Sequence, residues 1–184
     1  KNQLLIGYVS LGEAEGYRPY WKSMAGKDWV LYENPDWPDN HVIDTRSQEW
    51  ADTLVKQEIP RIKARGYKGL FLDTLDVGPE QEAAGKTGAR LAMLNLVQSI
   101  RRAFPELILI SNNGLGLMPE LAREVDGLLI EGLHYQYDIA THKSSPMPEA
   151  VTKEKLSILK NCQRPVLVIE YTEEAEQAQS LCQS

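Results

Sequence analysis

The sequence predicts an α/β fold built on a parallel sheet, and three observations support this prediction. Five short apolar runs each end at a polar residue, which is typical of buried parallel strands. Segments with helical spacing separate most of these runs, and no internal repeat or low-complexity linker interrupts them. The predicted strands lie near residues 4–9, 69–73, 107–111, 127–131 and 166–170.

Two architectures fit this alternation, an open doubly wound sheet and a (β/α)8 TIM-type barrel. Doubly wound dinucleotide-binding folds carry a Gly-x-Gly-x-x-Gly turn after their first strand, and no such turn follows residues 4–9. Acidic side chains stand instead at the ends of several strands, as they do at the mouth of a barrel. We therefore expect a barrel, although the alternation by itself does not separate the two architectures.

The first predicted strand leads into an acidic loop flanked by glycines, Ser10 to Gly16. Glycine lets the backbone approach a ligand closely, so Glu13 is a candidate site residue, with a solvent-exposed loop acid as the alternative. Residues 17–37 are irregular and rich in tyrosine and tryptophan. Aromatic rings suit the apolar faces of sugars, but a small cluster packed under a long loop would have the same composition.

Helical spacing, capping residues and stop signals predict the helices. They lie at residues 47–65, 89–104, from about 119 toward the fourth strand, and 149–160. Ser47 is expected to cap the first helix and Pro60 to kink it. Residues 77–88, which contain glycine and proline, are expected to form a loop, and residues 132–137 a second aromatic loop.

Composition limits the classes of function. The chain has 184 residues, 42% hydrophobic and 25% charged, which fits one well-buried domain over residues 1–184. Its net charge of -6 argues against nucleic acid or an anionic membrane as the main partner. No apolar run approaches the roughly 20 residues of a membrane span, and the first residues do not resemble a signal peptide. We expect a monomer.

Two of the predicted strands run directly into an acid, Asp73 and Glu131. The carboxyl ends of barrel strands converge on one mouth, so these acids are expected to face each other across a substrate. Glycoside cleavage needs such a pair, one carboxyl to protonate the leaving oxygen and one on the anomeric side. The alternatives are a helix cap for Asp73 and a structural ion pair for Glu131.

Five motifs, in order along the chain, resemble those of glycoside hydrolase family 114. They are Tyr8 to Glu15, Gly69 to Thr74, Asn112 to Gly114, Glu131 to Leu133, and Ile169 to Tyr171. The same series is similar to the hydrolase domain of the Pel exopolysaccharide protein, which belongs to a related family. The resemblance covers nearly the whole chain.

The resemblance implies a (β/α)8 barrel, without a metal or other cofactor, that cleaves α-1,4-linked galactosamine and N-acetylgalactosamine polymers internally. It implies Asp73 and Glu131 as the catalytic residues and an extracellular or periplasmic location. Relatives have two further strands before residues 4–9 and one after Tyr171. This chain would then hold about strands three to seven of the barrel and lack the terminal strands.

Other residues at the predicted mouth are expected to bind the substrate. They are Tyr8, Glu13, Glu15, Asp76, Asn112, Asn113, Tyr135, Glu170 and Tyr171. Glu170 stands where many relatives have aspartate, which leaves its role open. The acids among them would attract a cationic amino-sugar polymer.

We expect a retaining mechanism, with Asp73 as nucleophile and Glu131 as acid/base, by similarity to other barrels. Carboxyl groups lie about 5 to 5.5 Å apart in retaining enzymes and roughly 6.5 to 9.5 Å apart in inverting ones. Two other functions stay open. One is a barrel that binds a polysaccharide without cleaving it, and the other is a metal-assisted hydrolase with Asp73 and Asp76 as ligands.

The histidines and cysteines carry weaker expectations. His41, His134 and His142 form no i,i+4 pair or Cys/His cluster, so a zinc site is not expected. His134 either lines the mouth or packs against it. Cys162 and Cys182 either form one disulfide or remain two thiols.

Overall fold

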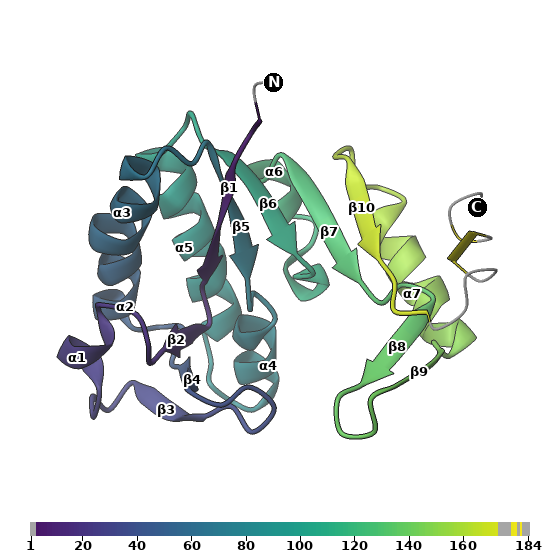
Figure 1. The fold of residues 1–184 in the computed structure, drawn as a ribbon, viewed down its shortest axis with the longest axis horizontal. Coiled ribbons are helices and arrows are strands. Elements are labelled where there is room, and N and C mark those ends of the chain that lie inside the picture. Colours follow the sequence, from purple (N-terminus) through teal and green to yellow (C-terminus); the bar gives the residue numbers. More distant parts are fainter. Residues whose placement is uncertain (1–2, 173–177, 180, 182–184) are drawn as a thin grey trace.

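The structure is a computed structural model that describes residues 3–172, 178, 179 and 181. Its centre is a sheet of five parallel strands in the order β1-β5-β6-β7-β10 (Figure 1). These strands are β1 (Ile6–Ser10), β5 (Gly69–Asp73), β6 (Ile108–Asn112), β7 (Gly127–Glu131) and β10 (Val166–Ile169). All five predicted strands are confirmed, with small shifts at their ends.

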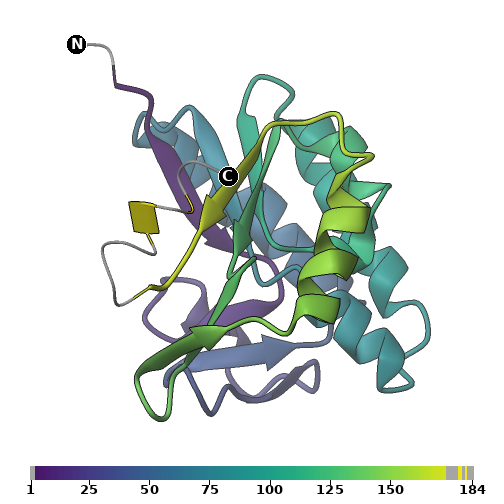
Figure 2. The same cartoon turned by 90° about the vertical axis from the view of Figure 1, so that its right-hand side faces the viewer.

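The strand order fits five consecutive strands of a (β/α)8 barrel and differs from that of a doubly wound sheet. Each strand pairs with the next parallel strand along the chain, so the order never reverses. A doubly wound sheet has a point at which the strand order reverses, and this sheet has none. Figures 1 and 2 show the long helices gathered on one face of the sheet, and the carboxyl ends of the strands all point the same way. The predicted fold class is therefore confirmed.

Alternating strand residues divide the sheet into a core face and a cavity face. On the core face, Val9, Leu72 and Leu109 are at most 2% exposed and belong to one hydrophobic cluster with the buried residues of α5 (Ala89–Ala103). Burying each such side chain contributes roughly 1.5 to 3 kcal/mol. The opposite face presents Tyr8 and Ile169, which are 38% and 42% exposed. Successive side chains of a strand point to opposite faces of the sheet, so the same five strands supply both the core and the residues that face the cavity.

The predicted helix at residues 47–65 forms as one helical segment with a change of pitch. It consists of α2 (Gln48–Thr53), a π-helical stretch η1 (Leu54–Glu58) and α3 (Ile59–Ala64). The Ser47 side chain accepts a hydrogen bond from the Trp50 backbone amide at 3.2 Å, which confirms the predicted cap. Pro60, which was expected to kink this helix, lies directly after the π-helical stretch, at the start of α3.

Residues 77–88 were expected to form a loop, but Val77–Ala83 form the helix α4. Gly78 explains the error, because a Cβ there would lie 2.6 Å from the Cβ of Met93 on α5. The glycine allows close helix packing, whereas the sequence pattern treats glycine beside proline as a turn signal. The remaining helices are α1 (Trp21–Met24), the 3-10 turn η2 (Leu115–Leu117), α6 (Leu121–Glu124) and α7 (Glu149–Leu159).

Two small antiparallel units stand at the carboxyl ends of the parallel strands (Figure 1). One is a three-stranded sheet in the order β2-β4-β3, formed by β2 (Glu13–Glu15), β4 (Asn40–Ile43) and β3 (Val30–Glu33). The other is the hairpin of β8 (Tyr135–Asp138) and β9 (Lys143–Pro146). Residues 17–37 and 132–137, which contain β3 and most of the first hairpin strand β8, were expected to be irregular, because their short strands lack the alternation that marks a half-buried strand.

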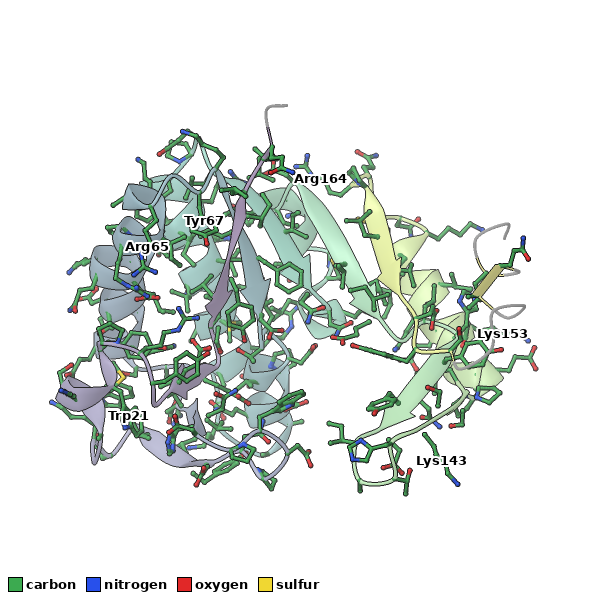
Figure 3. The ribbon with its side chains drawn as sticks, viewed as in Figure 1. Trp21, Arg65, Tyr67, Lys143, Lys153 and Arg164 are labelled. Atoms are coloured by element: carbon green, nitrogen blue, oxygen red, sulfur yellow. The ribbon has the colours of Figure 1, made fainter. Side chains whose placement is uncertain are left out.

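Basic residues labelled in Figure 3 mark the two ends of the sheet. Arg164 lies at the amino ends of the strands, whereas Lys143 lies on the hairpin at the opposite end. No helix in the described part of the chain has both the length and the apolar content to cross a membrane.

Cys162 is partly buried against the core, but Cys182 lies outside the described residues, so their pairing stays a prediction.

Candidate active site

Asp73 is held from both sides by residues of the neighbouring strands. The Tyr8 hydroxyl on β1 donates to Oδ2 of Asp73 at 2.9 Å, and Asn112 Nδ2 on β6 donates to Oδ1 at 2.9 Å. The next helix begins at Val77, and its N-terminal flanking residue is Asp76. The Asp73 carboxylate is therefore held at the end of its strand by two hydrogen-bond donors. Its described contacts do not include a backbone amide of the following helix, so it does not cap that helix there.

Glu131 ends β7 and lies beside the same amide. Asn112 Nδ2 donates to its Oε2 at 3.2 Å, and the Tyr171 hydroxyl donates to its Oε1. Its backbone amide donates to Asn113 Oδ1 at 3.0 Å. Asn113 can reach this position because it adopts φ 52°, a left-handed conformation that asparagine tolerates better than most residues. The described partners of the Glu131 carboxylate are an amide and a phenol, not a cation.

Glu13 is a buried third acid beside this pair. Only 5% of Glu13 is exposed, and Asn34 Nδ2 donates to its Oε1 at 2.8 Å. Gly12 positions it, because the Gly12 amide donates to Thr74 Oγ1 at 2.7 Å and a Cβ on Gly12 would lie 2.5 Å from the Thr74 carbonyl oxygen. Burial raises the pKa of Glu13, and the charge of Asp73 raises it further. A solvent-exposed loop acid is thereby excluded.

Both strand-end acids line one cavity of about 530 Å³, here called the catalytic cavity. Glu13 lines it as the third carboxyl, and none of the described lining residues is lysine or arginine. Its other lining residues are Tyr8, Asn34, Trp37, Asn40, Phe71, Thr74, Asn112, Asn113, Leu129 and Ile169. Converging carboxyl and amide groups on an apolar floor are typical of a site for a neutral or cationic polar ligand.

Two tyrosines supply hydroxyl donors to the catalytic pair. Burial raises the pKa of Tyr8 well above its usual value, and the nearby Asp73 carboxylate raises it further. The hydrogen bond to Glu131 raises the pKa of Tyr171 to about 12. Both hydroxyls therefore stay protonated through the neutral range and keep their role as donors.

The family model of glycoside-hydrolase family GH114 matches residues 1–184. The chain belongs to glycoside-hydrolase family GH114. Relatives include proteins described only as uncharacterized from Thermotoga maritima, 28% identical over 92% of this chain and 55% of its own length, and Deinococcus radiodurans, 31% identical over 91% and 56%. The chain thus spans about half the length of these relatives.

Two solved structures share the fold of this chain. The glycoside hydrolase domain of PelA from Pseudomonas aeruginosa has a TM-score of 0.79 and 26% identity, over 96% of this chain and 70% of that domain. Ega3 from Aspergillus fumigatus, solved in complex with galactosamine, has a TM-score of 0.70 and 16% identity, over 98% and 69%. The second likeness is evidence of fold alone. The enzyme class expected from the sequence, glycoside hydrolase, is confirmed at the level of family.

Two of the predicted substrate-binding acids of this GH114 chain have other partners. Glu15 accepts from Arg18 Nε at 2.6 Å and from the Tyr17 hydroxyl, inside a cluster with Glu58. Asp76 accepts from the Gly114 amide at 3.3 Å, and burial raises its pKa. Neither acid lines the catalytic cavity. Their predicted contact with substrate is untested, and their described contacts hold the surrounding loops.

Glu170 anchors the start of the β8–β9 hairpin. Its Oε1 accepts from the His134 backbone amide at 2.7 Å, and its Oε2 accepts from the Tyr135 amide at 3.0 Å. His134 Nδ1 lies 2.9 Å from the same Oε1. Tyr135, predicted to bind substrate, contributes its backbone here and does not line the catalytic cavity. His134 likewise packs on Glu170 and does not line that cavity.

Sequence reasoning missed several residues at the GH114 site. Asn34 follows β3 and Asn40 begins β4, and nothing in their local pattern indicates a site. Trp37 belongs to the aromatic segment 17–37, which did suggest a sugar groove, but the pattern did not single it out. Among the described residues, no three His, Cys, Asp or Glu side chains form a group that could hold a metal ion.

Proposed function

We propose that this GH114 chain forms the active site of an endo-acting hydrolase of α-1,4-linked galactosamine and N-acetylgalactosamine polymers. The observation that carries the proposal is the pair of strand-end carboxyls, Asp73 and Glu131, joined by Asn112 in one cavity. A non-catalytic binding barrel would have no need of this pair. The pair matches the acid and nucleophile that glycoside cleavage requires.

The charge of the catalytic cavity supports an amino-sugar substrate. Glu13, Asp73 and Glu131 converge there, with no described lysine or arginine among the lining residues. Such a cavity attracts the ammonium group of a deacetylated amino sugar. Ega3, a protein of the same fold, was solved in complex with galactosamine, which is an amino sugar of the kind that this charge favours.

The spacing of the two acids supports retention of configuration. One nitrogen of Asn112 contacts an oxygen of Asp73 at 2.9 Å and an oxygen of Glu131 at 3.2 Å. Those two oxygens are therefore at most about 6.1 Å apart, which is below the roughly 6.5 to 9.5 Å that separates the carboxyl groups of inverting enzymes.

In this mechanism Asp73 attacks the anomeric carbon while Glu131 protonates the departing glycosidic oxygen. The bond to that oxygen breaks, and a glycosyl ester to Asp73 forms. Glu131, now ionised, then removes a proton from water, which attacks the same carbon and releases Asp73. Tyr8 and Asn112 hold the attacking carboxylate in place through both displacements.

A turnover assay on purified α-1,4-galactosamine oligomers tests the proposal, with and without a chelator. We expect cleavage that is insensitive to the chelator and that falls on the order of 10⁴-fold in Asp73→Asn, a substitution that keeps the shape and removes the charged nucleophile. Binding without cleavage would indicate the binding barrel. Cleavage abolished by the chelator and restored by Mg²⁺ would indicate the metal-assisted alternative.

The remaining expectations belong to the whole protein. We propose that residues 1–184 belong to a single barrel domain, which the one continuous parallel sheet of the described residues, with β1 and β10 at its two edges, supports. A monomeric state stays a proposal, and an extracellular or periplasmic location rests on the family resemblance. Size-exclusion chromatography with light scattering and fractionation of the producing cells test them.

A further inference from the structure

A second cavity adjoins the catalytic cavity on the side of Glu131. It has a volume of about 640 Å³, here called the hairpin cavity, and it shares Trp37, Asn113 and Glu131 with the first. Asp73 does not line it. Its remaining lining residues are Gly132, Gln136, Tyr137, Ile139, His142, Met147 and Tyr171. The two cavities are therefore two halves of one groove that meet at Glu131.

The positions of the two acids give each half of the groove a different task. The sugar whose anomeric carbon is attacked must lie over Asp73, and only the catalytic cavity contains Asp73. The acid/base protonates the oxygen that leaves with the other sugar, so that sugar lies beyond Glu131. The hairpin cavity is the part of the groove that touches Glu131 without touching Asp73.

The hairpin cavity also has the side chains that hold a sugar ring. The rings of Tyr137 and Tyr171 lie 5.4 Å apart between centroids, and 42% and 37% of these residues are exposed. The Tyr137 hydroxyl lies 3.2 Å from His142 Nδ1, which fixes the ring. Exposed aromatic rings with a polar tip and one apolar face suit the C–H face of a pyranose.

The hairpin is fixed to the rest of the fold at its base. Glu170 accepts the two backbone hydrogen bonds described above, and Lys155 Nζ on α7 donates to the Gly132 carbonyl oxygen at 2.7 Å. Thr152 Oγ1 donates to the Leu133 carbonyl oxygen at 3.0 Å. A rigid base lets Tyr137 present its ring in a constant position, so less freedom is lost when a sugar binds.

We propose that the β8–β9 hairpin forms the leaving-group subsite, with Tyr137 as its stacking platform. The subsite takes the pyranose ring on the reducing-end side of the cleaved bond, and its lining is more apolar than that of the catalytic cavity. The proposal rests on the proposed function. It adds which half of the groove binds which part of the polymer. It also names Tyr137 as the residue that determines how tightly the leaving group is bound.

The test compares two substrates that differ only in what fills the hairpin cavity. A galactosamine oligomer fills both halves of the groove, whereas α-galactosaminyl fluoride fills only the catalytic cavity, because fluoride is a small leaving group. In Tyr137→Ala, kcat/KM on the oligomer should fall about tenfold, since one aromatic stacking contact is lost. The rate on the fluoride should stay within about twofold of wild type. Tyr137→Phe keeps the ring, so it should retain more of the activity on the oligomer than Tyr137→Ala does.

Tyr32→Ala is the matched control, because Tyr32 is another exposed tyrosine, 60% exposed, that lines neither half of the groove. It should leave both rates unchanged. Equal losses on oligomer and fluoride in Tyr137→Ala, or no loss on either, would overturn the subsite. If wild type acts on neither substrate, the proposed function fails instead, so the two failures are distinguishable.

A partition measurement removes any dependence on the fraction of folded enzyme. With the fluoride as donor and methyl α-galactosaminide as acceptor, the acceptor must enter through the leaving-group subsite. The ratio of transfer to hydrolysis should fall about tenfold in Tyr137→Ala, for the same stacking reason. An unchanged ratio would place Tyr137 outside the subsite.

Discussion

Asp73 and Glu131 accept hydrogen bonds from the same atom, Nδ2 of Asn112, at 2.9 and 3.2 Å. The amide orientation is unambiguous, because the alternative would point an oxygen at two carboxylates. Asn112 Oδ1 is buried and has no hydrogen-bond partner among the described residues. Among the described residues, the Asn112 side chain therefore forms hydrogen bonds with the two acids alone.

Removal of this shared donor should impair catalysis more than folding. We expect Asn112→Ala to lower kcat about 10- to 100-fold, since hydrogen bonds to charged groups contribute about 1.5 to 3 kcal/mol. Asn112→Asp should cost more activity, because it replaces the donor with a third carboxylate between two others. Steady-state kinetics and melting temperatures check both variants. A kcat within about threefold of wild type in Asn112→Ala would contradict the role.

Glu131→Gln should separate the acid role from substrate binding. On a polymer, whose leaving group needs a proton, we expect a loss of about 10² to 10⁴-fold. On an activated aryl glycoside the loss should be much smaller, and added azide should restore turnover by attacking the glycosyl intermediate directly. The azide product should keep the α configuration of the substrate, as NMR would show.

Other outcomes of the Glu131→Gln experiment would revise the mechanism. A β-azide would mean a single displacement and would reverse the retaining assignment. Equal losses on polymer and aryl glycoside, without azide rescue, would mean that Glu131 binds substrate or supports structure but transfers no proton.

Glu170→Ala should loosen the hairpin without touching the catalytic pair. The side chain of Glu170 is 11% exposed and accepts from two backbone amides. Its loss should cost about 2 kcal/mol, or roughly 4 to 8 °C in melting temperature, and hydrogen exchange at residues 134–138 should increase. Tyr171→Phe is the control, because it removes the contact with Glu131 and leaves the hairpin anchor intact. Unchanged exchange in Glu170→Ala would contradict the anchor.

Glu13→Gln should change how stability depends on pH. Burial raises the pKa of Glu13 above its usual 4.5, so the folded state binds this proton more tightly than the unfolded state. The contribution of Glu13 to stability is therefore greatest below about pH 4 and declines as the pH rises through the raised pKa. The melting temperature of Glu13→Gln, measured against wild type, should rise between about pH 4 and 7. If the difference in melting temperature between Glu13→Gln and wild type stays constant or shrinks over this pH range, burial does not raise the pKa of Glu13.

The positions of the core strands and of the two catalytic candidates could be predicted from the sequence. Apolar runs that end at Asp73 and Glu131 are local patterns, and the burial of a parallel strand follows from its own composition. The cap at Ser47 is equally local, since one side chain bonds to an amide three residues away. The helix α4 was missed because Gly78 is explained by contact with Met93, a residue that no local pattern can place beside it.

Only the tertiary structure decided which of the remaining acids and rings meet at the groove. Glu13 and Glu15 are two residues apart, yet Glu13 lines the catalytic cavity and Glu15 joins Arg18. Trp37 and Tyr137 line the hairpin cavity together although they are far apart in the chain. The physical reason is that strand period and helix spacing specify which way a residue faces within its element. Which residues then share a cavity depends on the pairing of distant strands and on the anchoring of the hairpin.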